Sequence, residues 1–296
     1  MNAMNNIKTH APSISSSAML VDLTVAVWSG RKKDQQAGDE VTRNKGAATG
    51  VASVYKALLG ECAELTAVQK FAASVRTAHY AKTLPWSDTG PRLLTTANYF
   101  DYVRDMSLLR GEFDQLVSKF LDAYSWQITQ AQAKLGALFN AAEYPDTETL
   151  RDKFSMKYNF IPLAEVGDFR LDIQNEAQRV LCEEYEQYYA SQLHHAMADV
   201  WGRLHTALSR MSDRLEVSAD GKKVFRDSLV SNVEEVAELL HTCNVTKDPA
   251  MEQARVDLVN ALRGVTPDGL RADAALRRHT KAAVDKIIAG LPGMGF

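Results

Sequence analysis

Apolar residues between Ala97 and Ala142 recur at steps of three or four along 46 residues that contain no proline. This spacing predicts one long helix with a single buried stripe. The stripe consists of Tyr99, Tyr102, Met106, Leu109, Phe113, Leu116, Phe120, Tyr124, Ile128, Ala131, Leu135 and Leu138. At 1.5 Å per residue the helix would be roughly 70 Å long, which is more than a compact domain of this size needs. We therefore expect it to pack along a partner helix.

A second apolar stripe of the same period extends from Asp172 to Leu215. Its members are Leu181, Tyr185, Tyr189, Leu193, Met197, Val200, Leu204, Leu208, Met211 and Leu215. The segment between the two long helices can reverse the chain, so we expect them to pack as an antiparallel helical hairpin.

Three shorter helices are predicted to follow, over Val224–Thr242, Pro249–Arg263 and Pro267–Ala289. A capping residue, Asp248 or Thr266, stands directly before the proline that begins each of the last two helices. We expect these helices to form a C-terminal group.

Two stretches have the residue pattern of strands. Leu20–Trp28 is rich in valine, leucine and threonine, and Phe154–Leu163 alternates aromatic or apolar residues with polar ones. A strand needs a partner for its backbone hydrogen bonds, so we predict that these two stretches pair in a small two-stranded sheet.

The remaining segments predict connections and short helices. Arg31–Gly50 is charged and punctuated by glycine, which predicts an exposed connection with room for one short helix. Val51–Leu59 and Glu64–Lys82 are predicted to be helices separated at Gly60, and Leu84–Thr95 is predicted to be a proline- and glycine-rich loop.

These elements predict a mainly α protein with a long antiparallel helical hairpin, a small two-stranded β-sheet and a C-terminal helical group. Residues 1–18 are polar and serine-rich and are expected to form a flexible tail. Residues 19–296 are expected to form a single elongated helical domain. Its parts are 19–170 with the first long helix, 171–217 with the second, and 218–296 with the C-terminal helices.

Composition narrows the class of protein without identifying an activity. Of the 296 residues 46% are hydrophobic and 24% are charged, and the net charge is only −3, so nucleic-acid binding would need a local basic patch. The three cysteines, Cys62, Cys182 and Cys243, are far apart, which favours reduced thiols over a disulfide framework or a zinc site. The longest apolar run, Ala18–Trp28, is too short to span a bilayer. We therefore expect a cytoplasmic protein that does not insert into membranes.

An enzymatic site finds little support in the sequence. No phosphate-binding glycine motif and no nucleophile-elbow motif is present, and no cofactor is expected. His195 and Asp199 are four residues apart on one helical face, a spacing that suits two metal ligands. Asp199 can equally pair with Arg203 at the same spacing, and we favour that solvated arrangement over a metal site.

Two stretches combine tryptophan with charged residues, and they are the candidate binding surface. The residues concerned are Trp28, Arg31, Lys32 and Lys33 in the first stretch, and Trp86, Asp88 and Arg92 in the second. An indole beside cationic groups suits stacking on a base and contact with phosphate, but tryptophan and arginine serve protein interfaces as well. The structural alternative is that both indoles are buried and the charges are solvated.

The same two stretches resemble the family catalogued as domain of unknown function 3150, and the resemblance covers the chain from about residue 19 to its end. The matching segments are Leu20-Val21-Asp22-Leu23, Trp28-Ser29-Gly30-Arg31-Lys32, Thr83-Leu84-Pro85-Trp86-Ser87-Asp88, Arg92-Leu93-Leu94, Asn98-Tyr99-Phe100, Leu138-Phe139-Asn140, Glu143-Tyr144-Pro145, Gly167-Asp168-Phe169-Arg170 and Phe225-Arg226-Asp227-Ser228-Leu229. The resemblance implies a bacteriophage or mobile-element protein in a bacterial host. It also implies neighbouring genes for a MoxR/CobS-like AAA+ ATPase and for a von Willebrand-type or CobT-like protein. It carries over no catalytic residue.

Three functions remain open at this point. The first is a non-enzymatic adaptor or assembly protein that binds a protein partner, either the AAA+ ATPase or further copies of itself. The second is a nucleic-acid-binding accessory factor in recombination or replication. The third is a metal-dependent enzyme around His195 and Asp199. The observation that would distinguish them best is whether Trp28 and Trp86 are buried or share an exposed groove.

Overall fold

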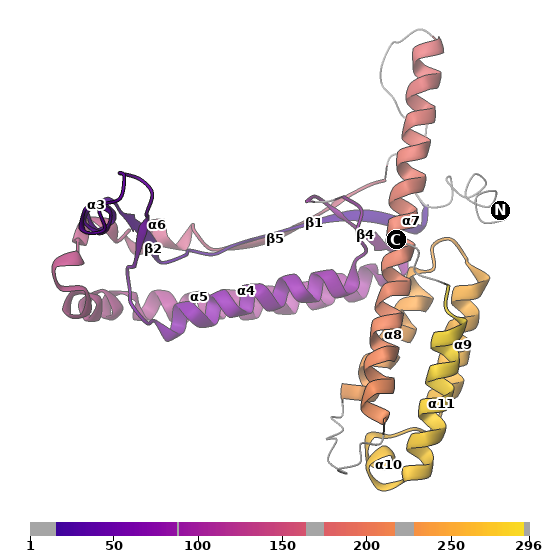
Figure 1. The fold of residues 1–296 in the computed structure, drawn as a ribbon. Coiled ribbons are helices and arrows are strands. Elements are labelled where there is room, and N and C mark those ends of the chain that lie inside the picture. The colour runs from indigo at the N-terminus through magenta and orange to yellow at the C-terminus, as the bar shows by residue number, and fades with distance from the viewer. Residues whose placement is uncertain (1–15, 88, 164–174, 217–227, 293–296) are drawn as a thin grey trace. The chain divides into compact units, whose positions relative to one another are not determined.

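The computed structural model describes residues 16–87, 89–163, 175–216 and 228–292 (Figure 1). Their secondary structure is predominantly helical, which confirms the predicted mainly α class. None of the helices in these segments combines the length and hydropathy that crossing a membrane requires. The predicted tail lies almost entirely outside the described residues.

The chain forms two compact units where the sequence predicted one elongated domain. Unit 1 comprises Met1–Asp22, Ala81–Phe100 and Phe160–Phe296, and unit 2 comprises Leu23–Tyr80 and Asp101–Asn159. Both units are therefore assembled from segments that are distant in the sequence.

A three-stranded sheet contains both predicted strands and one that was not predicted. Its order is β4 (Arg92–Thr95), β1 (Ala18–Ala26), β5 (Ser155–Ile161), so β1 and β5 are neighbours as expected. β4 pairs antiparallel with β1, with Val21 opposite Arg92. The prediction of a loop over residues 84–95 is therefore wrong at its end. Only four residues of β4 pair, and a run this short is hidden by the turn residues before it.

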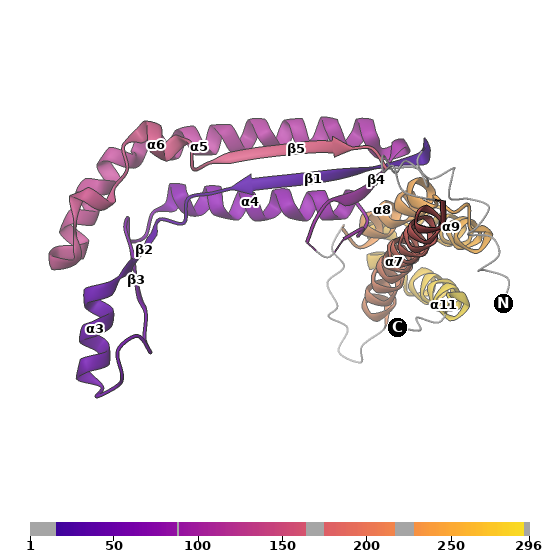
Figure 2. The same cartoon turned by 90° about the horizontal axis from the view of Figure 1, so that it is seen from above.

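Two helices run side by side beneath β1 and β5 in unit 2 (Figures 1 and 2). They are α4 (Ala63–Lys82) and α5 (Tyr99–Leu135), and the predicted bounds of α4 are correct to one residue. α5 is shorter than predicted and is followed by short 3₁₀ turns. Gly136, with a φ of +52°, ends it in the left-handed conformation that glycine adopts without a steric penalty.

The apolar stripe of α5 is buried inside unit 2. Phe120, fully buried, packs against Phe154 with ring centroids 5.6 Å apart. The other buried residues of α4, α5 and β5 include Leu65, Val68, Ala72, Val75, Tyr102, Met106, Phe113, Val117, Leu121, Tyr124 and Met156. The long helix is therefore covered by a neighbouring helix and by strands of its own unit.

Residues 31–57 form a compact β–α–β element of unit 2, which we call the small lobe. β2 (Arg31–Asp34) pairs antiparallel with β3 (Val54–Ala57), and α3 (Gln35–Asn44) connects them (Figure 2). The prediction of a helix over Val51–Leu59 is wrong, because its centre is a strand. The charged segment before it is an ordered strand and helix instead of a mere connection.

Unit 1 contains a helical bundle (Figure 1). Its members are α7 (Asn175–Leu215), α8 (Ser228–Cys243), α9 (Pro249–Leu262), α10 (Pro267–Ala272) and α11 (Ala274–Gly290). α7 packs against α8 and α11, and α9 packs against α8 and α11. The buried side chains of α7 belong to the same core as those of α8, α9 and α11.

The two long helices do not bury their apolar stripes against each other, so the predicted hairpin is wrong. α5 contributes its apolar residues to unit 2, whereas α7 contributes its own to the bundle of unit 1. The period of a stripe shows that one face is buried but carries no information on what covers it. The predicted C-terminal helices are confirmed, with Asp248 and Thr266 as caps, but Asp273 splits the last one by capping a new helix. Asp146 caps a further short helix, α6 (Thr147–Arg151).

Candidate functional site

Trp28 is a packing residue of unit 2. Its half-buried ring lies 6.1 Å from the ring centroids of both Phe120 and Tyr124. The chain then turns at Gly30, whose φ is +64°, and passes so close to α4 that an added Cβ would come within 2.7 Å of Leu65. The indole thus anchors the strand that leads into the small lobe.

Trp86 is buried in the core of unit 1. Its side chain is 5% exposed, and its ring meets that of Tyr189 edge-on at 5.1 Å. Arg92 turns inward as well, since its guanidinium donates hydrogen bonds to the hydroxyl and carbonyl oxygens of Thr83 at 2.8 and 3.1 Å. Asp88 lies outside the described residues. This stretch is therefore structural, and the prediction that both indoles line an exposed surface is wrong for Trp86.

The candidate metal ligands serve other purposes. His195 is exposed, and Asp199 forms an ion pair with Arg203 at 2.8 Å. Arg203 also donates to the carbonyl oxygens of Ala81 and Thr83, both at 2.9 Å. Across the described part of the chain, no cluster of three or more potential ligands could hold a metal ion. The alternative pairing of Asp199 is the one that the structure contains.

A buried cation holds the small lobe to the rest of unit 2. The ammonium of Lys56 lies 2.8 Å from Glu143 and 3.1 Å from Asp34, and it donates to the carbonyl oxygen of Leu138 at 2.9 Å. Its side chain is only 8% exposed. The hydrogen bond to Glu143 is the main reason that the pKa of Lys56 is raised, with a further contribution from Asp34.

Asp34 links this network to the helix of the lobe. Its carboxylate accepts a hydrogen bond from the backbone N–H of Ala37 at 3.0 Å and so caps α3. That bond, followed by the one from Lys56, lowers the pKa of Asp34. One carboxylate therefore fixes both the start of α3 and the buried lysine.

The two faces of the β2–β3 sheet have different surroundings. Lys32 stands directly opposite Lys56 in the register, and both ammonium groups point toward Glu143, with Lys32 at 3.8 Å. Tyr144 donates a hydrogen bond from its hydroxyl to the carbonyl oxygen of Leu58 on the same side. This inner face is thus attached to the body of unit 2.

The opposite face of the sheet carries Arg31, Lys33 and Tyr55, and we call it the outer face. Lys33 is directly opposite Tyr55 in the register, and Arg31, two residues before Lys33, shares their face. All three side chains are exposed, that of Tyr55 by 63%. Among the described residues, neither cation of this face has an ion-pair partner. Of the predicted binding residues, two thus remain available, and Tyr55 joins them.

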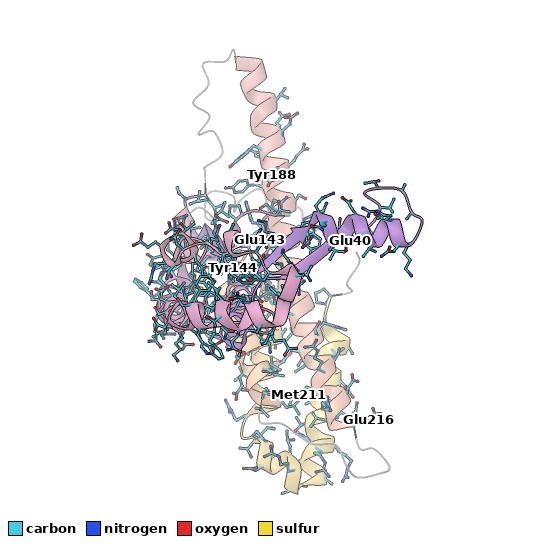
Figure 3. The ribbon with its side chains drawn as sticks, turned by 90° about the vertical axis from the view of Figure 1, so that its left-hand side faces the viewer. Glu40, Glu143, Tyr144, Tyr188, Met211 and Glu216 are labelled. Atoms are coloured by element: carbon cyan, nitrogen blue, oxygen red, sulfur yellow. The ribbon has the colours of Figure 1, made fainter. Side chains whose placement is uncertain are left out.

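The small lobe is locally basic in a chain of net charge −3. Residues 31–57 contain six basic and three acidic side chains, although the protein as a whole is slightly acidic. Arg43 and Lys45 are exposed at the end of α3. Figure 3 shows α3, which carries Glu40, projecting from the part of unit 2 that holds Glu143 and Tyr144. A positively charged projection is the expected form of a surface that meets an anionic partner.

One further polar cluster resembles a catalytic pair but lacks its chemistry. Ser212 of α7 accepts a hydrogen bond from Lys281 at 2.9 Å and donates one to Asp285. Lys281 also bonds Asp285 at 2.7 Å, and this bond raises the pKa of the lysine. A serine nucleophile needs a neutral amine as its base, whereas this amine is kept charged. The cluster joins α7 to α11.

Sequence reasoning missed Tyr55 because it placed that residue in a helix. The available signal was the short alternation of Val54 and Lys56 with Tyr55 and Ala57, which a four-residue strand displays only weakly.

Comparison of the chain with protein-family models, with curated proteins and with solved structures finds no match.

Proposed function

We propose that the protein is a non-enzymatic adaptor whose small lobe binds an anionic partner. The observation that carries this proposal is the outer face, where Arg31, Lys33 and Tyr55 are exposed together on one side of a short sheet. Cationic side chains beside an exposed aromatic ring give both long-range attraction and a contact surface.

The attachment of the lobe supports the same function. Lys56 is held by two carboxylates and a carbonyl oxygen, and Tyr144 bonds the chain directly after β3. A surface that is fixed before binding loses less conformational entropy when its partner arrives. The inner face thus serves to present the outer face in one orientation.

The biological setting that we propose comes from the family resemblance. It places the adaptor in a bacteriophage or mobile element, in the cytoplasm of a bacterial host, beside a MoxR/CobS-like AAA+ ATPase. An acidic surface on such an ATPase is the protein partner that this setting suggests. The alternatives are self-assembly and, for an accessory factor of recombination or replication, a nucleic acid. The outer face supplies the positive half of such a contact.

The test is affinity purification of the tagged full chain from a bacterium that co-expresses the neighbouring ATPase. The variant Arg31→Glu/Lys33→Glu reverses two charges on the outer face. The control Lys70→Glu/Lys119→Glu makes the same charge change at exposed positions of α4 and α5. We expect the wild type and the control to retain a protein or nucleic-acid partner that the first variant loses. A wild type that stays monomeric and free of any partner would contradict the proposal.

A further inference from the structure

We propose that the outer face of the small lobe is a binding site for single-stranded nucleic acid. In this arrangement the ring of Tyr55 stacks on one base, and Arg31 and Lys33 contact neighbouring phosphates. The inference rests on the proposed function in that the lobe is taken as the contact surface, and it names the class of the anionic partner.

The register of β2 and β3 sets the spacing of the three side chains. Arg31 and Lys33 are two residues apart on one strand, so their Cα atoms are separated by roughly 7 Å along it. Tyr55 stands directly across from Lys33, where Cβ atoms of paired residues are about 5 Å apart. An aromatic ring with one cation directly opposite and a second diagonal to it, at these separations, can contact a base and the backbone of the same nucleic-acid strand.

The chemistry of this face favours a nucleic acid over an acidic protein. The only other residue of the paired strands on this face is Ala57, opposite Arg31, so the face holds no carboxylate and no large apolar side chain. A hot-spot tyrosine at a protein interface is usually surrounded by groups that exclude water from it. A lone exposed ring beside two cations of the neighbouring strand instead suits stacking on a base, because every base offers a π-face whatever its identity.

The inner face explains why the carboxylates of Asp34 and Glu143 do not oppose binding. Asp34 and Glu143 are turned toward Lys56 and neutralise it on the buried side. The cations of the outer face therefore keep their charge for a ligand. If Arg31 and Lys33 each contact one phosphate of a single strand, the logarithm of the affinity should fall with the logarithm of the salt concentration. These two contacts should contribute about −1.4 to the slope.

The experiment is a titration of the full chain against a fluorescein-labelled single-stranded oligothymidylate, followed by fluorescence anisotropy at several salt concentrations. Tyr55→Ala removes the stacking ring, and Tyr55→Phe retains it. Trp126→Ala is the matched control, since Trp126 on α5 is exposed by 60%, close to the exposure of Tyr55. Arg31→Glu/Lys33→Glu and Lys70→Glu/Lys119→Glu are the charge variant and its control, and circular dichroism verifies that each variant is folded.

We expect Tyr55→Ala to bind about tenfold or more weakly and Tyr55→Phe and Trp126→Ala to bind like the wild type. Arg31→Glu/Lys33→Glu should lose binding. Where binding remains measurable, the slope of the logarithm of the affinity against the logarithm of the salt concentration should be less negative by about 1.4. Failure of the wild type to bind at low salt, or equal binding by Tyr55→Ala, would overturn the nucleic-acid site. If the charge variant then still lost a protein partner in the co-purification, the adaptor function would stand and only the partner class would be wrong.

Discussion

The ammonium of Lys56 lies 2.8 Å from the carboxylate of Glu143, and this pair joins the small lobe to the 3₁₀ turn Ala141–Glu143 that follows α5. Asp34 completes the network from the end of β2. One buried cation thus joins both strands of the lobe to the segment after α5, and we expect its removal to loosen the attachment of the outer face.

Lys56→Met is expected to destabilise the lobe, because the carboxylates of Asp34 and Glu143 lose the cation that they share. Hydrogen exchange measured by mass spectrometry should show faster exchange in residues 31–57, while α4 and α5 stay protected. Lys70→Met, at an exposed position of α4, should change nothing measurable. Unaltered exchange in the lobe of Lys56→Met would contradict the role of the network.

The same network predicts how the lobe responds to pH. The pKa of Asp34 is lowered, so its contribution is present above its ordinary pKa of about 3.9 and is lost as the pH falls through the folded-state value. The pKa of Lys56 is raised, so its contribution is complete below about 10.4 and is lost as the pH rises through its folded-state value. Exchange in the lobe, corrected for its intrinsic rate, should therefore be slowest between these limits. Lys56→Met should abolish the alkaline loss, and a wild type whose lobe is most stable at pH 3 would refute the scheme.

Gly30→Ala tests the turn between Trp28 and β2. We expect a loss of roughly 1–3 kcal/mol in the free energy of unfolding, because the φ of +64° is strained for alanine and its Cβ would meet Leu65. Gly111→Ala is the matched control within α5, where an added Cβ meets nothing within 4 Å. That variant should be about 0.5–1 kcal/mol more stable. Urea unfolding measures the change in the free energy of unfolding of both variants. Equal changes would show that the turn at Gly30 is not strained.

Asp199→Asn tests the ion pair against the metal alternative. Loss of the contact that orients Arg203 should cost about 1 kcal/mol, whereas His195→Ala should change stability by less than about 0.5 kcal/mol. Zinc added in slight excess should leave the melting temperature of the wild type unchanged. A zinc-dependent rise that both substitutions remove would restore the metal site.

The parts of the fold that the sequence predicted are those with long, regular patterns or strong local signals. The bounds of α4 and the caps Asp248 and Thr266 were predictable because a 3.6-residue period and a capping side chain act locally. The prediction that α5 packs against α7 was wrong, because an apolar stripe does not indicate which element covers it. The sequence of β2 alone does not indicate a strand, because its charged residues form one only by pairing with β3, about twenty residues later in the chain.

The candidate site was predicted only in part, for a related reason. Arg31 and Lys33 stood out through charge, but Lys32 between them points to Glu143 on the inner face. That division depends on the alternation of a strand that was not recognised. Tyr55 was missed with β3, and Trp86 is core because its ring packs on Tyr189 of α7, far away in the chain.

The most direct test of the outer face is to locate the contact on the bound protein. The full chain would be cross-linked by ultraviolet light to single-stranded DNA that contains 4-thiothymidine, and the attached peptide would be identified by mass spectrometry. We predict cross-links in β2 or β3, chiefly at Tyr55, and their loss in Arg31→Glu/Lys33→Glu. Cross-links that map outside residues 31–57 and persist in that variant would contradict it.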